Sequence, residues 1–197
     1  MIGAEGVALR LHRYLVTELP GRSAISPATL AGQPSPPLAF ASTAEVGQLG
    51  VEQYPALFTL TREMLGMTYV DDLDDGSEAY RVRYQLRLLL WARDESHERV
   101  DLIRKRYALM LRELLLLSRT AGIPEGFGFA VDVESIRESY SEAIPAAEGR
   151  TIAAVYLDVQ VTITEEVAGR PPSGDADSIA LELLTLDTPP TPDSQAL

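Results

Sequence analysis

Hydrophobic and polar residues alternate with a strict period of two in two long segments of the chain. In residues 80–91 one side carries Tyr80, Val82, Tyr84, Leu86, Leu88 and Leu90, and the other carries Arg81, Arg83, Gln85, Arg87, Leu89 and Trp91. In residues 150–166, odd-numbered apolar residues such as Val155 and Leu157 alternate in the same way with Tyr156 and Asp158. This period predicts two long β-strands, each with one face in the core. The second face of the first strand is basic early and apolar late, which suggests that a neighbour covers its far end.

Two segments have the period of an amphipathic helix. In residues 2–19 an apolar stripe contains Val7, Leu11, Leu15 and Leu19, and Pro20-Gly21 is expected to end the helix. The second helix is expected to start at Asp94-Glu95-Ser96, a capping sequence with acidic residues in the first turn. Its apolar stripe is Val100, Ile103, Tyr107, Met110, Leu111, Leu114 and Leu117, and Gly122 and Pro124 are expected to end it.

The remaining segments complete an α+β fold. Residues 54–70 predict one or two strands, residues 129–144 a strand with an irregular second half, and residues 179–186 a possible short strand. We therefore expect one domain over residues 1–167, with an antiparallel sheet, long strands and two helices packed on one face. A proline-rich insertion at about 20–53 is interpreted as a linker or surface arm. A proline-rich extension follows at 168–197.

Charge is spread unevenly along the 197 residues, whose net charge is −12. Residues 81–119 hold ten Arg or Lys against five Asp or Glu, whereas both flanks are acidic. We expect little DNA binding from so acidic a chain, because phosphates attract cations. There is no cysteine, the apolar runs are too short for a membrane span, and charges within the first twenty residues argue against a signal peptide. We expect synthesis in the cytoplasm and no membrane partner.

The basic centre is a possible docking surface for an acidic neighbour. Its candidate residues are Arg81, Arg83, Arg87, Trp91, Arg104 and Arg106. The alternative is that these arginines lie on solvated faces and pair with the chain's own carboxylates.

Known catalytic and ligand-binding motifs are incomplete in this sequence. His97-Glu98-Arg99-Val100-Asp101 resembles a zinc-protease helix but ends in Asp instead of His. Residues 71–76 suggest a calcium loop, but Leu73 and Val82 occupy ligand positions, so only a loose surface calcium site stays open. Gly126-Phe127-Gly128 lacks the third glycine of a dinucleotide loop. Carboxylate pairs such as Glu165-Glu166 cannot be told from coincidence among 29 acidic residues. We expect no enzyme activity, no cofactor and no metal.

Three runs of the sequence resemble tail terminator and minor tail proteins of long-tailed bacteriophages, especially those of actinobacterial hosts. The first is residues 80–88, a long strand that leads to an acidic helix start. The second is residues 131–141, and the third is Gly149-Arg150 with the long strand through Val161. Together with the first helix, the resemblance covers residues 1–20 and 54–167.

The resemblance implies a virion structural protein at the head–tail interface. Such subunits form a hexameric ring that caps the tail tube, ends its polymerisation and contacts the head-tail connector or stopper protein. DNA passes through the lumen without specific binding. The acidic turn with Asp71, Asp72, Asp74 and Asp75 is our candidate for the lumen lining, because an acidic channel repels DNA.

Three other functions stay open. The chain could be another neck component, such as a head-completion or stopper ring, although stoppers tend to be small β-barrels and the long helix at 95–120 argues against that. It could be a tail-tube or baseplate subunit. A small-molecule-binding α+β domain or an enzyme is the most remote alternative.

Overall fold

The computed structural model of the chain describes residues 3–25, 39–40, 53–120 and 128–168. Its two α-helices are α1 (Gly3–Ile25) and α2 (His97–Thr120). Its strands are β1 (Ala39–Phe40), β2 (Ala56–Asp72), β3 (Glu78–Asp94), β4 (Phe129–Tyr140), β5 (Ile144–Pro145) and β6 (Thr151–Val167). A short 3-10 turn, Ala147–Gly149, links β5 to β6.

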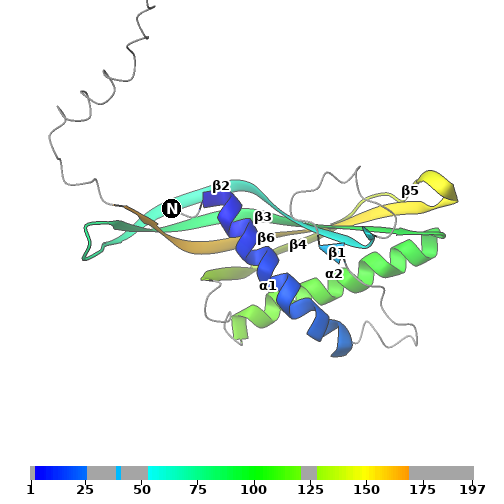
Figure 1. The fold of residues 1–197 in the computed structure, drawn as a ribbon, viewed down its shortest axis with the longest axis horizontal. Helices are drawn as coiled ribbons and strands as arrows, with labels where there is room; N and C mark the ends of the chain where they lie inside the picture. Colours follow the sequence, from blue (N-terminus) through cyan, green and yellow to red (C-terminus); the bar gives the residue numbers. More distant parts are fainter. Residues whose placement is uncertain (1–2, 26–38, 41–52, 121–127, 169–197) are drawn as a thin grey trace, which may run out of the picture.

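All six strands belong to one sheet, with the order β1-β2-β3-β6-β4 and with β5 paired to the end of β6. The pairs are antiparallel except for the two-residue strand β1, which runs parallel to β2. β3 and β6 form its centre and pair without interruption from Glu78 opposite Val167 to Asp94 opposite Thr151. The long strands curve gently along the molecule (Figure 1).

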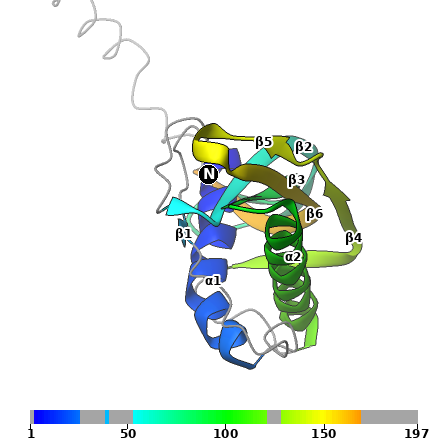
Figure 2. The same ribbon diagram turned by 90° about the vertical axis from the view of Figure 1, so that its right-hand side faces the viewer.

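Both helices cover the same face of this sheet, and they lie side by side beneath it when the molecule is viewed along its length (Figure 2). Between helices and sheet is one hydrophobic core, in which the largest fully buried side chains include Leu11 and Leu15 of α1, Leu111 and Leu115 of α2, and Leu88 of β3. The expected α+β fold with two helices on one face is confirmed.

The period-two alternation of the two long strands is confirmed as well. On β3 the even-numbered residues from Val82 to Ala92 are buried beneath the helices, and on β6 the odd-numbered residues from Ala153 to Glu165 are buried. The intervening residues point to the opposite face of the sheet, which we call the open face. β2 is a single strand over Ala56–Asp72, so it begins two residues after the segment 54–70, for which one or two strands were expected, and ends two residues beyond it.

The first helix does not end at Pro20. α1 continues through Pro20 and Gly21 to Ile25, so the expected stop was wrong. Proline removes one backbone hydrogen bond within a helix. Both Pro20 and Gly21 are exposed, so the carbonyl that loses its partner lies on the wet side of the helix. Residues 20–25 consequently belong to α1 and not to the proline-rich arm.

The start of the second helix follows the predicted pattern, whereas the strand expected at 129–144 does so only in part. Ser96 caps α2, because its Oγ accepts a hydrogen bond from the N–H of Arg99 at 3.2 Å. In β4 the pairing with β6 shifts between Asp132 and Arg137, in the first half of the expected strand instead of the second, and β4 ends at Tyr140. Ser135 bridges this gap by accepting the N–H of Gln160 at 2.7 Å. The expected stop of α2 at Gly122 and Pro124, the strand at 179–186, most of the arm at 20–53 and all but the first residue of the extension at 168–197 lie outside the described residues.

Candidate interaction surface

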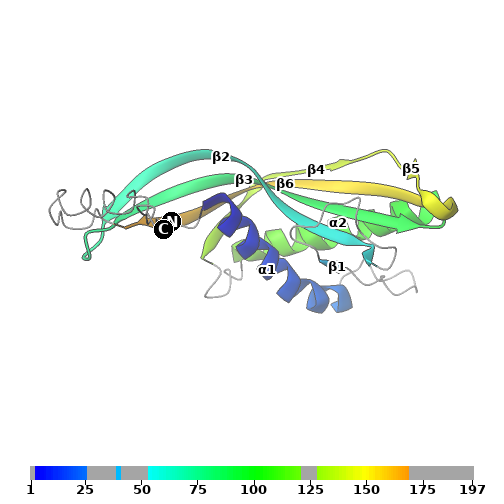
Figure 3. The same cartoon turned by 45° about the horizontal axis from the view of Figure 1, so that its top comes forward.

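The hairpin formed by β2 and β3 extends past both helices (Figure 3). We call residues 62–84 the hairpin arm; Val82 and Tyr84, at its base, still belong to the core. The part of β2 that α1 covers ends at the first turn of this helix, where the carbonyl of Ala4 accepts a hydrogen bond from Oγ1 of Thr61 at 2.6 Å. The rest of β2 therefore leaves the body of the molecule without a helix beneath it.

The hairpin arm exposes most of its large apolar side chains. Those of β2 that lie more than a third exposed are Met64, Leu65, Met67, Tyr69 and Val70. The strand register places Met64, Met67 and Tyr69 opposite Tyr84, Val82 and Tyr80, which are helix-side positions of β3. We call Met64, Met67, Tyr69 and Tyr80 the arm patch. It continues the core-facing side of the sheet beyond the helices.

The arm patch ends in a pair of tyrosines flanked by carboxylates. The rings of Tyr69 and Tyr80 meet edge to face, with centroids 5.9 Å apart. The hydroxyl of Tyr80 donates a hydrogen bond to Glu78, which raises the pKa of Tyr80. The pKa of Tyr69 is also raised, by partial burial of the ring and by a hydrogen bond with Asp72. The apolar patch thus has an acidic end.

The four aspartates expected in an acidic turn, Asp71, Asp72, Asp74 and Asp75, are exposed at the tip of the hairpin arm. Asp71 and Asp72 are the last residues of β2, so only Asp74 and Asp75 lie in the turn itself. Asp75 stabilises the turn, because its carboxylate accepts hydrogen bonds from the N–H (2.9 Å) and the Oγ of Ser77, which lower the pKa of Asp75. Gly76 has a φ of 79°, a conformation that favours glycine. Asp74, the residue before Asp75, makes no such hydrogen bond among the described residues, so its carboxylate is the more accessible of the two to a partner.

The candidate arginines of β3 divide into two groups on the open face. Arg81 and Arg83 lie on the hairpin arm, exposed, and neither pairs with a carboxylate of the described residues. Arg87 makes two hydrogen bonds of 2.7 Å to Asp158 on β6 and lies over the ring of Tyr156. The alternative of internal pairing therefore holds for Arg87, whereas Arg81 and Arg83 stay available to a partner.

The other three candidates for the docking surface, Arg104, Trp91 and Arg106, lie in different parts of the structure. Arg104 is buried between α2 and the sheet, where it donates to the carbonyls of Ser141 (2.7 Å) and Ala154 (3.3 Å) and pairs with Asp101 at 2.6 Å. It is therefore not part of an exposed surface. Trp91 is half-buried on the open face, and Arg106 lies on the outward side of α2. The six candidate residues do not form one surface.

A second apolar stripe follows the outward side of α2. Leu102, Leu109 and Leu116 are spaced by seven residues, which places them along one line of the helix. Leu102 and Leu116 are 43% and 45% exposed, and Leu109 is half-buried. Arg106 lies between the first two leucines, and Lys105 and Arg99 flank them with exposed side chains. We call Leu102, Leu109 and Leu116 the α2 stripe.

Glu165 and Glu166 lie on opposite faces of the sheet. Glu165 is fully buried beneath α1, where Oε1 accepts hydrogen bonds from the hydroxyl of Tyr84 (2.8 Å) and the N–H of Gly3 (3.0 Å). Burial and this hydrogen bond raise the pKa of Tyr84 to about 12. Glu166 is exposed on the open face. The two carboxylates therefore cannot act as a pair on one substrate.

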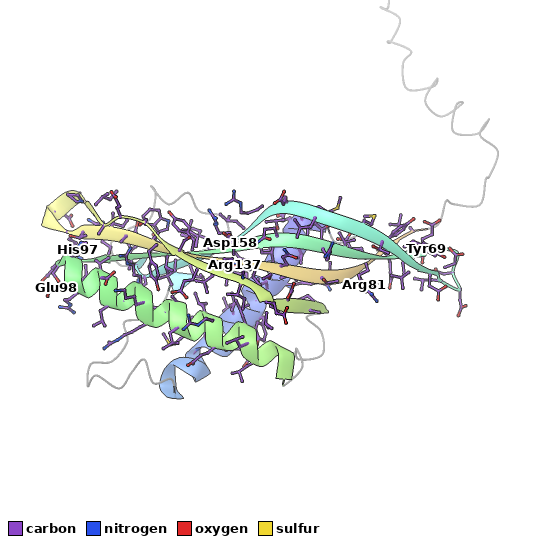
Figure 4. The ribbon with its side chains drawn as sticks, turned by 180° about the vertical axis from the view of Figure 1, so that it is seen from behind. Tyr69, Arg81, His97, Glu98, Arg137 and Asp158 are labelled. Atoms are coloured by element: carbon purple, nitrogen blue, oxygen red, sulfur yellow. The ribbon has the colours of Figure 1, made fainter. Side chains whose placement is uncertain are left out.

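A hollow of about 680 Å³ is lined by polar and charged groups that include Arg10, Asp75 and Glu166. Within the described ranges, no group of three His, Asp or Glu side chains is arranged to hold a metal ion. His97 and Glu98 are exposed at the start of α2, far along the molecule from Tyr69 and Arg81 (Figure 4). A hollow of about 300 Å³ lies between α1 and β2. It is lined mainly by apolar groups and by His12, whose pKa is lowered by burial.

Comparison with known proteins gives no relative. No protein-family model matches the chain, and no curated protein matches its sequence. Neither of the described helices is long and apolar enough to cross a membrane.

The arm patch and the α2 stripe are the surface features that sequence reasoning missed. A signal for the arm patch is present in residues 64–70, where apolar residues break the alternation and appear on both faces of the strand. A signal for the α2 stripe is the seven-residue spacing of its leucines beside the core stripe. In the sequence, the residues of the arm patch and of the α2 stripe are easily taken for core residues, because the sequence shows that a side chain is apolar but not whether it is buried.

Proposed function

We propose that this chain is a structural subunit of a bacteriophage tail, which forms a ring of six copies that caps the tail tube and joins it to the head connector. The sequence resemblance over the two long strands and the segment between them supports this proposal. The observation that carries it is the hairpin arm, which leaves the body with an exposed apolar face. Isolated soluble proteins rarely expose such contiguous apolar surface, whereas assembly subunits bury it against neighbours.

The free edge of β2 supports the same proposal. β1 pairs only with Ala56 and Leu57, so the β2 edge beyond them has no strand beside it among the described residues. Soluble proteins protect long edges of this kind against association. In a ring, a neighbouring copy would cover this edge, while the register shifts of β2 hinder other strands from adding to it.

Deletion of the gene from the genome that carries it tests the capping function. We expect unattached heads together with tails of excessive and variable length, because the tube protein then has nothing to end its polymerisation. The measurement is the distribution of tail lengths in electron micrographs of the lysate, with the gene supplied from a plasmid as the control.

Other results of the same experiment would contradict the proposal. Tails of normal length that fail to join heads would assign the chain to a stopper ring. A complete loss of tubes would make it a tube or baseplate subunit. Normal infectious particles, or a locus without tail genes, would remove it from the virion altogether.

A further inference from the structure

We propose that the arm patch of one subunit packs against the α2 stripe of the next copy, so that the hairpin arm of each subunit lies across a neighbour's second helix. This inference rests on the proposed ring and names the contact that builds it. It is drawn from two exposed surfaces of one chain. Both are apolar, their lengths are comparable, and the charged residues beside them have opposite signs.

The two surfaces have comparable lengths. From Met64 to Tyr69, the arm patch covers roughly 17 Å of β2 at the rise of an extended strand. From Leu102 to Leu116, α2 covers about 21 Å at the helical rise. Methionine and tyrosine side chains on one side and leucines on the other can interdigitate, and Met adapts well to the shape of a partner.

Their charges are opposite. Residues 71–78, at the end of the arm patch, contain five acidic residues and no basic one. Residues 99–106 of α2 contain four basic residues and a single acidic one, Asp101. Of those four, Arg104 is buried, Arg99 pairs with Asp94 at 3.4 Å and Lys105 pairs with Asp101 at 2.5 Å, which leaves the half-buried Arg106 as the cation of this run without a carboxylate partner among the described residues. The acidic end of the arm therefore belongs over the first half of α2, with Met64 towards Leu116.

Pairing between unlike surfaces explains a closed ring. Each subunit has one arm patch and one α2 stripe, so a subunit can bind one neighbour with each of them. Such a heterologous contact produces a ring when its rotation closes, and a filament when it does not.

Simple pairing of free strand edges fits the structure less well. The register of β2 shifts three times within the strand, between Thr61 and Glu63, between Met64 and Gly66, and between Tyr69 and Asp71. Irregularities of this kind interrupt the hydrogen-bonding edge and hinder a second strand from adding along it. The side chains of the arm patch, and not the backbone edge, are therefore the contact surface.

Two charge-reversal variants of the full chain test this contact. The arm variant carries Asp72→Arg and Glu78→Arg, and the helix variant carries Leu102→Glu and Arg106→Glu. We expect each alone to remain a single chain of 21.5 kDa in light scattering coupled to size exclusion, at concentrations where the unmodified protein forms rings. Equal mixing should also give rings, in which the two variants alternate, because the intact arm then pairs with the intact helix and the reversed arm with the reversed helix. All four substitutions in one chain should restore the ring.

Arg81→Glu, on the opposite face of the same arm, is the matched control and should leave the ring intact.

The outcomes separate this inference from the proposed function. If rings persist in both variants, the contact is wrong while the ring stands. If the arm variant alone dissociates, the arms meet one another instead of α2, which also overturns the inference. Dissociation by Arg81→Glu would move the interface to the open face. If the unmodified chain is monomeric at every concentration, the self-assembled ring fails together with its contact. Circular dichroism of each variant checks that the helices are retained.

Discussion

Glu165 is the only fully buried ionisable side chain among the described residues, and it lies under the first turn of α1. A carboxylate is favoured at this position because the N–H groups at the start of a helix carry partial positive charge. The hydroxyl of Tyr84 supplies a second donor to the same oxygen. At the scale of single residues, these contacts fix the position of the first turn of α1. They therefore also fix the point on the sheet beyond which the hairpin arm has no helix over it.

The Tyr84 contact gives a pH-dependent prediction. An unfolded tyrosine ionises near pH 10, whereas the pKa of Tyr84 is raised to about 12 in the folded protein. The unfolded chain therefore loses this proton first, and the contribution of Tyr84 to stability, complete below pH 10, is lost as the pH rises from 10 towards 12. We expect Tyr84→Phe to lower the free energy of unfolding at pH 8 by about 1–2 kcal/mol.

Urea unfolding at pH 8 to 11 checks this expectation. The difference in stability between the unmodified protein and Tyr84→Phe should shrink above pH 10, since the variant has no phenol to ionise at this position. A difference that stays constant across the range would show that Tyr84 does not ionise more readily on unfolding.

At the scale of elements, polar contacts join the first half of α2 to the sheet and its second half to α1. Arg104 joins it to the carbonyls of Ser141 and Ala154, and its guanidinium lies 5.1 Å from the ring of Tyr140. Further along, the carbonyl of Leu114 accepts the hydroxyl of Tyr14 from α1 at 3.2 Å. These contacts hold the outward side of α2, with its stripe of leucines, in a fixed orientation.

Replacement of Arg104 tests how much its contacts between α2 and the sheet contribute to stability. We expect Arg104→Leu to lower the free energy of unfolding by roughly 3 kcal/mol, because two carbonyls and Asp101 lose buried hydrogen bonds. Arg106→Leu, two residues further on the outward side of the same helix, should change it by less than about 0.5 kcal/mol. Chemical denaturation of both variants measures the contrast. Equal losses in the two variants would mean that Arg104 contributes no more than a surface residue.

The sequence was sufficient to predict the long strands, because alternation over so many residues is specific to a strand with one buried face. It could not distinguish Arg104 from Arg106, since both belong to one basic run and only the packing of α2 decides which is buried. It also misplaced the end of α1, where an exposed proline is tolerated inside the helix. The bare hairpin arm could not be predicted either, because the extent of helical cover depends on where α1 is anchored in three dimensions.

At the scale of the whole molecule, the two ends differ in cover. Helices protect one end of the sheet, while the hairpin arm at the other end has an apolar helix-side face and a polar open face with Arg81 and Arg83. A subunit with one bare arm and one exposed helix stripe has the two unlike surfaces that a ring of identical copies requires. The acidic tip remains the candidate lumen lining only if the assembled arms leave Asp71 and Asp74 unpaired.

Negative-stain electron microscopy of the purified full chain decides whether the protein assembles as proposed. We expect closed rings of six subunits with an open centre and a uniform diameter. Single 21.5 kDa particles at every concentration, or open filaments that grow with concentration, would contradict the proposed ring.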